Sequence, residues 1–344
     1  LILWRSSSQW IGGLYFLFSI ILLIDIFDDN LKKTLTNFLA FNSTEIFKQS
    51  LKIFFYYTFL TFLIFTILNI FDFRSFLSFN LSMTIISSGG FLPTNSLSLL
   101  LNTQSKEIIL SLVMLLSFFS LFFTYNLALY KQKGIKFIQE DIYLIFYLIV
   151  IFFTCFVFID KKIDFSLIFL AICSSVSNIG ISMDKTPTYL SFIFLILIII
   201  GGSFFSTSSG LRFMKIYSLL KFSVNEMISH AKPKNVFINK LPFSDKIMDT
   251  SDFYKYFLTI MAFFISLIIL SSILSISGLN FENAFKLSIL TIMNTVNSSM
   301  TGLKDFNFEE LNYITKYCLI LFMIIGRVEL LSLFIIFKKF FFKN

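Results

Sequence analysis

The chain has 344 residues, of which 56% are hydrophobic and only 14% are charged, and its mean hydropathy is +0.84. This composition excludes an ordinary soluble globule and predicts an all-α polytopic membrane protein. The net charge of +8 does not predict a nucleic-acid partner, because the basic residues gather in four segments between apolar runs. That alternation is typical of cytoplasmic loops and places the four basic segments in the cytoplasm.

Seven apolar runs are candidates for helices that cross a hydrocarbon core of about 30 Å. They are residues 11–27, 53–71, 108–130, 143–159, 189–201, 253–274 and 313–337. Three shorter apolar stretches would reach only the middle of the membrane as helices; they are residues 73–86, 165–175 and 281–293. Each leads into a strip of small residues and a polar return, so the same unit of spanning helix, half-helix, strip and spanning helix is predicted three times.

These repeats divide the chain into five predicted segments. Residues 1–30 form the second spanning helix of an incomplete first unit, and because the chain opens on Leu1 we expect a fragment that lacks the first helix, pore helix and filter strand of that unit. The other segments are a second unit at 31–130 with its strip near 87–91, a third at 131–221 with its strip near 177–181 and a broken helix at 201–210, a cytoplasmic linker at 222–250, and a fourth unit at 251–344 with its strip near 297–302.

The small-residue strips break the rules for membrane helices. Non-helical backbone survives at membrane depth only where it lines a cavity or is buried in protein. Glycine accepts positive φ, so successive carbonyl oxygens can turn toward one axis and replace the hydration shell of a cation. A half-helix also directs its partially negative C-terminal end toward the membrane centre. The strips therefore favour a cation pore, and close helix packing by small residues is the alternative.

An ordered set of motifs resembles the TrkH/KtrB potassium-uptake family over nearly the whole chain. The motifs are "WRSSSQWIGG" at 4–13, "SSGGF" at 87–91, "SVSNIGIS" at 175–182, "GGSFFSTSSGLRFMK" at 201–215 and "GRVELL" at 326–331. The resemblance implies repeated units in a pseudo-fourfold arrangement around one ion path in the bacterial inner membrane. It also implies permeating potassium with no other cofactor or metal, a lipid environment, a homodimer, and a cytosolic nucleotide-binding regulatory subunit of the TrkA/KtrA type.

The resemblance also implies the residues of the ion filter. They are Ser88, Gly89 and Gly90 in one unit, Asn178, Ile179 and Gly180 in the next, and Ser298, Ser299 and Met300 in the last. Gly90 and Gly180 fall on filter glycines of the family, whereas Met300 stands where another glycine is expected, with Gly302 two residues further on. Either the register is shifted and Gly302 acts, or the filter is asymmetric. This departure leaves selectivity for potassium over sodium open.

The predicted gate has two parts. Arg327 lies eleven residues from both Lys316 and Lys338, near mid-membrane, where an arginine costs at least about 2.5 kcal/mol and should face the protein interior or water. The alternative is an ion pair with Glu329, but residues two apart do not share a helix face. By resemblance Arg327 is an electrostatic barrier below the filter. The gating loop is the glycine- and serine-rich interruption, with Ser206, Thr207, Ser208, Ser209 and Gly210 as its residues and with Phe204 and Phe205 where the family has smaller ones.

Other functions are less favoured by the same residues. An intramembrane serine protease needs a base, and the only histidine, His230, lies in the predicted linker, so we predict no enzyme. A secondary transporter with broken helices predicts inverted repeats, whereas these units recur in one orientation. Transport of sodium or of cations without selectivity, and a non-conducting structural subunit, stay open. Cys155, Cys173 and Cys318 show no metal-ligand spacing and predict no disulfide.

Overall fold

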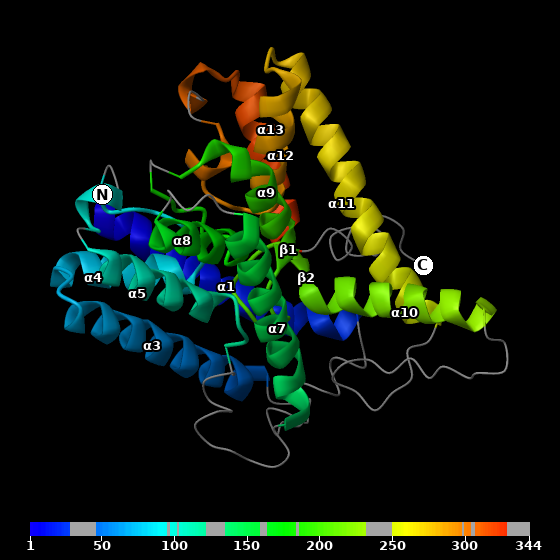
Figure 1. Ribbon diagram of the computed structural model, residues 1–344, viewed down its shortest axis with the longest axis horizontal. Helices are drawn as coiled ribbons and strands as arrows, with labels where there is room; N and C mark the ends of the chain where they lie inside the picture. The colour runs from blue at the N-terminus through cyan, green and yellow to red at the C-terminus, as the bar shows by residue number, and fades with distance from the viewer. Residues whose placement is uncertain are drawn as a thin grey trace.

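The computed structural model describes residues 1–27, 46–94, 97–101, 103–121, 135–158, 164–183, 186–231, 250–297, 299–303 and 307–328. This part of the chain is mostly helical (Figure 1). The longer helices are α1 (Ile2–Phe27), α3 (Ile46–Ile70), α7 (Ile135–Phe158), α10 (Phe213–Ala231), α11 (Thr250–Ile276) and α13 (Tyr313–Val328). Among the described residues, three stretches are long and apolar enough to cross a membrane: Ser50–Ile70, Glu140–Val157 and Phe253–Ile276. The predicted all-α polytopic fold is thereby confirmed.

Three half-length helices lie where the sequence predicts them. They are α4 (Ser75–Ile86), α8 (Phe165–Val176) and α12 (Phe281–Ile292), each of 12 residues. At 1.5 Å per residue each is about 18 Å long, which is too short to span a hydrocarbon core. α4 packs against α1 and α3, α8 against α5 and α9, and α12 against α11 and α13, so the small and polar residues at their C-terminal ends lie largely inside the protein.

Shorter elements complete the described chain. The helices are α5 (Gln104–Met114) and α9 (Ser191–Ile199), with 3₁₀ turns η1 (Leu97–Leu99), η2 (Leu115–Ser117), η4 (Thr188–Leu190), η5 (Ser299–Thr301) and η6 (Phe308–Glu310). Two short parallel strands, β1 (Ile200–Gly201) and β2 (Leu211–Arg212), pair with Ile200 opposite Leu211. These strands close the base of the loop at 202–210, so the predicted break in the helix is present.

The prediction of a spanning helix at 108–130 was wrong over the residues that the structure describes. The helix α5 ends at Met114, and after η2 the chain runs without helix from Phe118 to Leu121. The reason is a set of backbone hydrogen bonds to the 202–210 loop: the Phe118 carbonyl accepts from the Ser203 amide at 3.0 Å, and the Leu121 amide donates to the Phe205 carbonyl at 3.1 Å. Residues 122–130 lie outside the described part.

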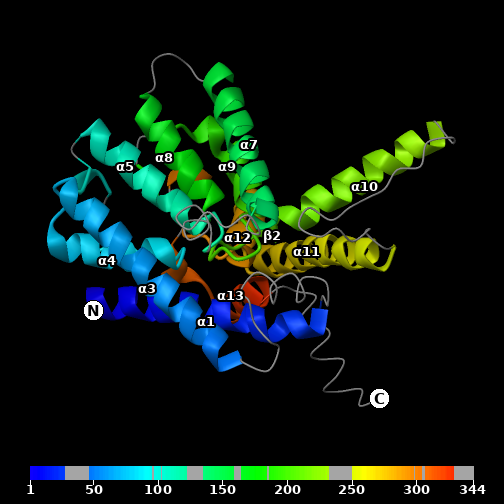
Figure 2. The same cartoon turned by 90° about the horizontal axis from the view of Figure 1, so that it is seen from below.

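The helices form two packed groups. α1, α3, α4 and α5 lie along one flank in both views (Figures 1 and 2), and their core contains Tyr57, Ile64 and Ile85. The second group packs α12 against α11 and α13 around Phe263 and Leu270. α10 packs against α11, where the ring centroids of Phe222 and Phe253 lie 4.6 Å apart, and it makes residues 222–231 of the predicted linker helical. Residues 232–249 of that linker are not described, and the predicted division into units stays a prediction.

Candidate functional site: converging strips and an intramembrane loop

α4, α8 and α12 end in the same hydrogen-bonded turn. In each, a residue with positive φ follows the C-cap: Ser88 at 52°, Asn178 at 57° and Asn294 at 52°. The next amide then bonds back to a carbonyl five residues earlier: Gly89 to Thr84 at 2.8 Å, Ile179 to Ser174 at 3.1 Å, and Thr295 to Leu290 at 2.9 Å. This Schellman closure ends the helix sharply and releases an extended strip at the same point of each unit.

The common turn fixes the register of the three strips. Counting from it, Gly90 and Gly180 are equivalent, and both have positive φ, at 70° and 82°. The residue at the same place after Asn294 is Val296. The last strip therefore carries a β-branched side chain at the position of the two glycines, and Val296 was missed by the sequence analysis because no glycine marks it.

The equivalent residues of the strips lie against one another. A Cβ added at Gly90 would overlap the Ile179 carbonyl oxygen and lie 2.5 Å from Cγ2 of Val296. A Cβ added at Gly180 would overlap the Val296 carbonyl oxygen and lie 2.8 Å from Cγ2 of Thr295. Both glycines are thus required by close backbone approach as well as by φ, and the three strips converge on one place in the fold.

Side chains beside the strips brace them. Gln9 of α1 donates from Nε2 to the Gly89 carbonyl oxygen at 2.8 Å. Asn178 donates from Nδ2 to the Ile198 carbonyl oxygen at 2.8 Å and to Thr295 Oγ1 at 3.3 Å, so its amide ties one strip to the next. Gln9 was not singled out from the sequence, although it lies within the motif at 4–13.

The last predicted filter residues lie elsewhere. Ser299 Oγ donates to the Met183 carbonyl oxygen at 2.9 Å and lies 3.1 Å from Ser182 Oγ. Met300 is fully buried in η5, where its sulfur accepts a hydrogen bond from Ser175 Oγ at 3.5 Å. The structure does not bring Met300 to the place where Gly90 and Gly180 meet Val296. Ser298 is outside the described residues.

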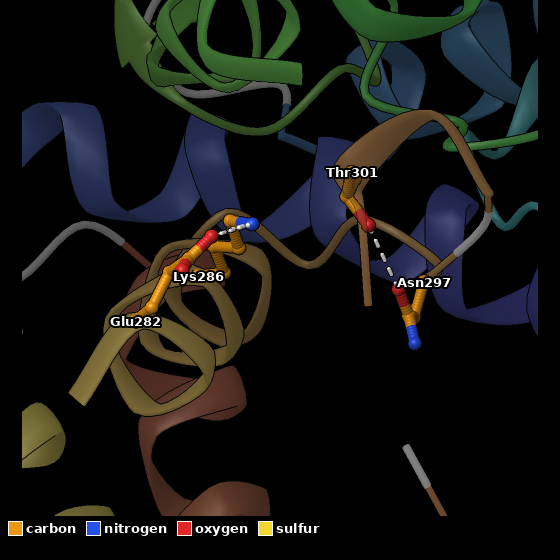
Figure 3. Close-up of polar contacts among 4 residues, drawn as sticks. All are labelled: Glu282, Lys286, Asn297 and Thr301. Carbon is orange, nitrogen blue, oxygen red and sulfur yellow. Dashed lines mark hydrogen bonds and ion pairs between the residues drawn. The ribbon is translucent and has the colours of Figure 1, made fainter. Parts of the chain in front are cut away.

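The segment that follows the last strip, from Asn297 to Gly302, has polar contacts of its own. Thr301 Oγ1 donates to Asn297 Oδ1 at 2.9 Å, and nearby Lys286 pairs with Glu282 one turn earlier on α12 (Figure 3). Gly302 has a φ of 76°, and a Cβ there would lie 3.1 Å from Nζ of Lys286. Gly302 thus belongs to the turn that leads away from the strips, and it does not take the register of Gly90.

An open cavity of about 760 Å³ borders two of the strips. It is lined by α1, by the strips after α4 and α12, by Phe308 and by α13, through Gln9, Gly12, Gly13, Ser87, Ser88, Gly89, Asn294, Thr295, Val296, Asn297, Phe308, Met323 and Arg327. Five of the residues that the strips contribute have side chains with oxygen atoms: Ser87, Ser88, Asn294, Thr295 and Asn297. The cavity therefore offers oxygen atoms and one fixed positive charge in the same space.

Arg327 of α13 joins a strip to the loop. Its Nη2 donates to the Ser87 carbonyl oxygen at 3.1 Å, and its Nη1 donates to Ser209 Oγ at 2.5 Å. The guanidinium carbon lies 4.4 Å from the ring centroid of Phe16 on α1. The charge is therefore held inside the protein directly beside the end of α4. A second link between strip and loop is the 3.4 Å contact of Ser88 Oγ with Thr207 Oγ1.

The 202–210 loop has a dense internal hydrogen-bond network. Ser208 Oγ accepts from the Gly202 amide at 3.0 Å and lies 2.9 Å from Ser206 Oγ. Gly210 has a φ of 90° and crosses Gly201 so closely that a Cβ on it would lie 2.8 Å from the Cα of Gly201. The predicted gate residues of the loop therefore form one compact hydrogen-bonded segment next to the strips, and Phe204 is buried beside it.

Comparison with known proteins gives matches in sequence and in fold, although no family model matches the chain. The "Trk system potassium uptake protein TrkH" of Escherichia coli K12 and that of Salmonella typhimurium are each 26% identical over 186 residues, which is 51% of this chain and 36% of the relative. The crystal structure of the potassium transporter TrkH from Vibrio parahaemolyticus aligns with a TM-score of 0.78 at 16% identity, over 97% of this chain and 71% of that one. The matched sequence thus spans about a third of the length of the curated relatives.

Proposed function

We propose that this chain takes part in potassium uptake. Its predicted resemblance to the TrkH/KtrB family is confirmed by sequence and by fold. The chain is accordingly a multi-pass protein of the bacterial inner membrane. The curated relatives are named as potassium uptake proteins, and the structural neighbour as a potassium transporter. Both names describe ion transport, and the absence of a catalytic function stays a prediction. In this proposal potassium is the transported ion.

One observation carries the proposal: the equivalent positions Gly90, Gly180 and Val296 meet at the ends of three half-helices. Each half-helix contributes about half a negative charge at its C-terminal end. Strip carbonyl oxygens at such a place can replace the water around a dehydrated cation. The path in this proposal runs between the strips and borders the cavity that contains Ser88 and Val296.

The gate in this proposal is formed by the 202–210 loop and Arg327. A cation leaving the strips would approach a guanidinium that is bonded to the Ser87 carbonyl and to Ser209. Two unit charges 5 Å apart repel by about 3 kcal/mol at an effective dielectric constant of about 20. That energy is enough to limit flux by more than tenfold while the loop holds its position.

Transport of sodium or of several cations is the second candidate, and Val296 is the observation that favours it. Its side chain is 38% exposed at the position where the other strips have glycine. Because the branched side chain makes this strip differ from the other two, the carbonyl oxygens of the three strips do not surround a cation symmetrically. The path is then less selective for an ion of one size. We also propose the homodimer, the TrkA/KtrA-type regulatory subunit and surrounding lipid as partners, by analogy with the family.

Growth under potassium limitation tests the function. Cells that lack their own potassium uptake should grow at low external potassium when they express the protein, and potassium should enter faster than sodium at equal concentration. Equal entry of the two ions would favour the second candidate. Normal insertion in the membrane with no cation entry would contradict both.

A further inference from the structure

Glu140 is a buried carboxylate outside the strips, and both of its oxygens hold the 202–210 loop. It lies on α7 at the start of the span Glu140–Val157 and is only 6% exposed. Its Oε2 accepts from Ser203 Oγ at 2.7 Å, and its Oε1 accepts from the Phe204 amide at 3.1 Å. The helix α7, which is distant in sequence, is thus hydrogen-bonded to Ser203 and Phe204 near the start of the loop.

Arg212 also holds Ser203 and, in addition, two later residues of the loop. Its Nη1 donates to the carbonyl oxygens of Ser203 and Ser208, both at 3.1 Å, and to Ser206 Oγ at 3.2 Å. Ser203 is therefore held by a carboxylate through its hydroxyl and by a guanidinium through its carbonyl. Ser203 thus lies between a buried carboxyl group and a buried guanidinium, and hydrogen bonds on both sides fix its position.

The neighbouring carboxylate has a different partner. Asp141 is 1% exposed, and its Oδ1 accepts from the Ser120 amide at 3.1 Å. The chain at Ser120 belongs to the non-helical segment that also bonds the loop. Of the two adjacent acids on α7, Glu140 is the one that accepts hydrogen bonds from the loop itself.

We propose that Glu140 is a positioning residue of the gate, which holds the 202–210 loop below the strips so that Thr207 stays at Ser88 and Ser209 stays at Arg327. It acts through its hydrogen bonds to Ser203 and Phe204. Release of this contact, as by a displacement of α7, frees the loop to withdraw from the strips. This inference rests on the proposed gate function, because it assigns what keeps that gate closed.

Thiol labelling at Ser209→Cys tests the position of the loop without measuring ion flux. The three native cysteines are replaced by alanine, the protein is reconstituted in vesicles, and the rate of modification by a small water-soluble thiol reagent is compared between variants. Glu140→Gln keeps the side-chain volume but cannot accept at both oxygens, and it should raise the rate on the order of tenfold, as for the loss of one charge-assisted hydrogen bond. Ser203→Ala removes the partner and leaves Glu140 in place; it should raise the rate in the same direction.

The double variant and a matched control decide between positioning and general loosening. If Glu140 acts through Ser203, the two substitutions together should have little more effect than Glu140→Gln alone. Thr154→Val, an exposed site on the same helix, should leave the rate unchanged. Unchanged labelling in both Glu140→Gln and Ser203→Ala, or fully additive effects, would overturn the proposal. This outcome is separable from failure of the gate itself, which is measured by flux through Arg327→Ala.

Discussion

Arg327 Nη2 lies 3.1 Å from the carbonyl oxygen of Ser87, the residue that caps the C-terminal end of α4. The same guanidinium reaches Ser209 of the loop, so one side chain connects a half-helix end, a strip and the interrupted helix. A positive charge at the partially negative end of a half-helix is favourable for the arginine. Under the proposed function, Arg327 also occupies a position where the negative end of α4 would otherwise stabilise a permeating cation.

Replacement of this charge should open the path. We expect Arg327→Ala to raise cation flux in reconstituted vesicles on the order of a hundredfold, which corresponds to the loss of about 3 kcal/mol of barrier. Arg327→Lys keeps the charge but cannot bond Ser87 and Ser209 at the same time through two nitrogens. Its flux should therefore lie between that of the unchanged protein and that of Arg327→Ala. A lower or unchanged flux from correctly inserted Arg327→Ala protein would count against the barrier.

The register of the last strip is testable by two exchanges. Val296→Gly should increase the preference for potassium over sodium, because it restores the residue type found at Gly90 and Gly180. Met300→Leu keeps the volume of a core side chain, should cost less than about 1.5 kcal/mol of stability, and should leave the preference unchanged. Competition uptake with both ions gives the ratio. A shift caused by Met300→Leu alone would support the register predicted from the sequence.

The contact between α12 and α13 should depend on Gly326. A Cβ at this residue would overlap the carbonyl oxygen of Ile292, at the end of the half-helix. Gly326→Ala should therefore force the helices apart and lower the free energy of unfolding by about 1–3 kcal/mol, visible as a lower Tm in detergent. Ile324→Ala, at an exposed site on the same helix, is the control and should change Tm much less. Equal Tm values for Gly326→Ala and the unchanged protein would show that the close contact is not required.

The Glu282–Lys286 pair should give an acid-dependent part of stability. Glu282 lies at the N-terminal end of α12, outside the three candidate spans, and the hydrogen bond and charge of Lys286 lower the pKa of its carboxyl. A lowered pKa means that the contribution is present above the ordinary value of about 4.3 and is lost as the pH falls through the lowered value. Glu282→Gln should reduce the loss of Tm between about pH 5 and pH 3, whereas Glu309→Gln, at an exposed site outside the pair, should not. The same acid profile in Glu282→Gln and in the unchanged protein would exclude this role.

Local features were the predictable part of the fold. The half-helices were predicted within two residues at each end, because an apolar stretch too short to span and a following strip of small residues are both visible in the chain. The bounds predicted as 165–175 and observed as Phe165–Val176 are an example. The turn at Asn178 and the glycine after it follow from the same local pattern.

Features that depend on distant contacts were not predictable from the sequence. The end of α5 at Met114 is decided by backbone bonds to a loop more than 80 residues later, so an apolar run was mistaken for one helix. The register of the last strip is set by the turn at Asn294, while the more visible glycine is Gly302. The hydrogen bond between Ser203 and Glu140 joins residues 63 positions apart, and no sequence pattern in either segment predicts it.

Cation flux through glycine variants of the strips tests the central claim most directly. Gly180→Ala and Gly90→Ala place a Cβ against a neighbouring strip at positive φ, whereas Gly12→Ala adds a Cβ in open space in the cavity that borders two of the strips. If the converging strips are the ion path, both strip variants should lose most potassium uptake in vesicles at equal amounts of inserted protein, and Gly12→Ala should retain it. Full uptake in Gly180→Ala and Gly90→Ala would contradict conduction between these strips.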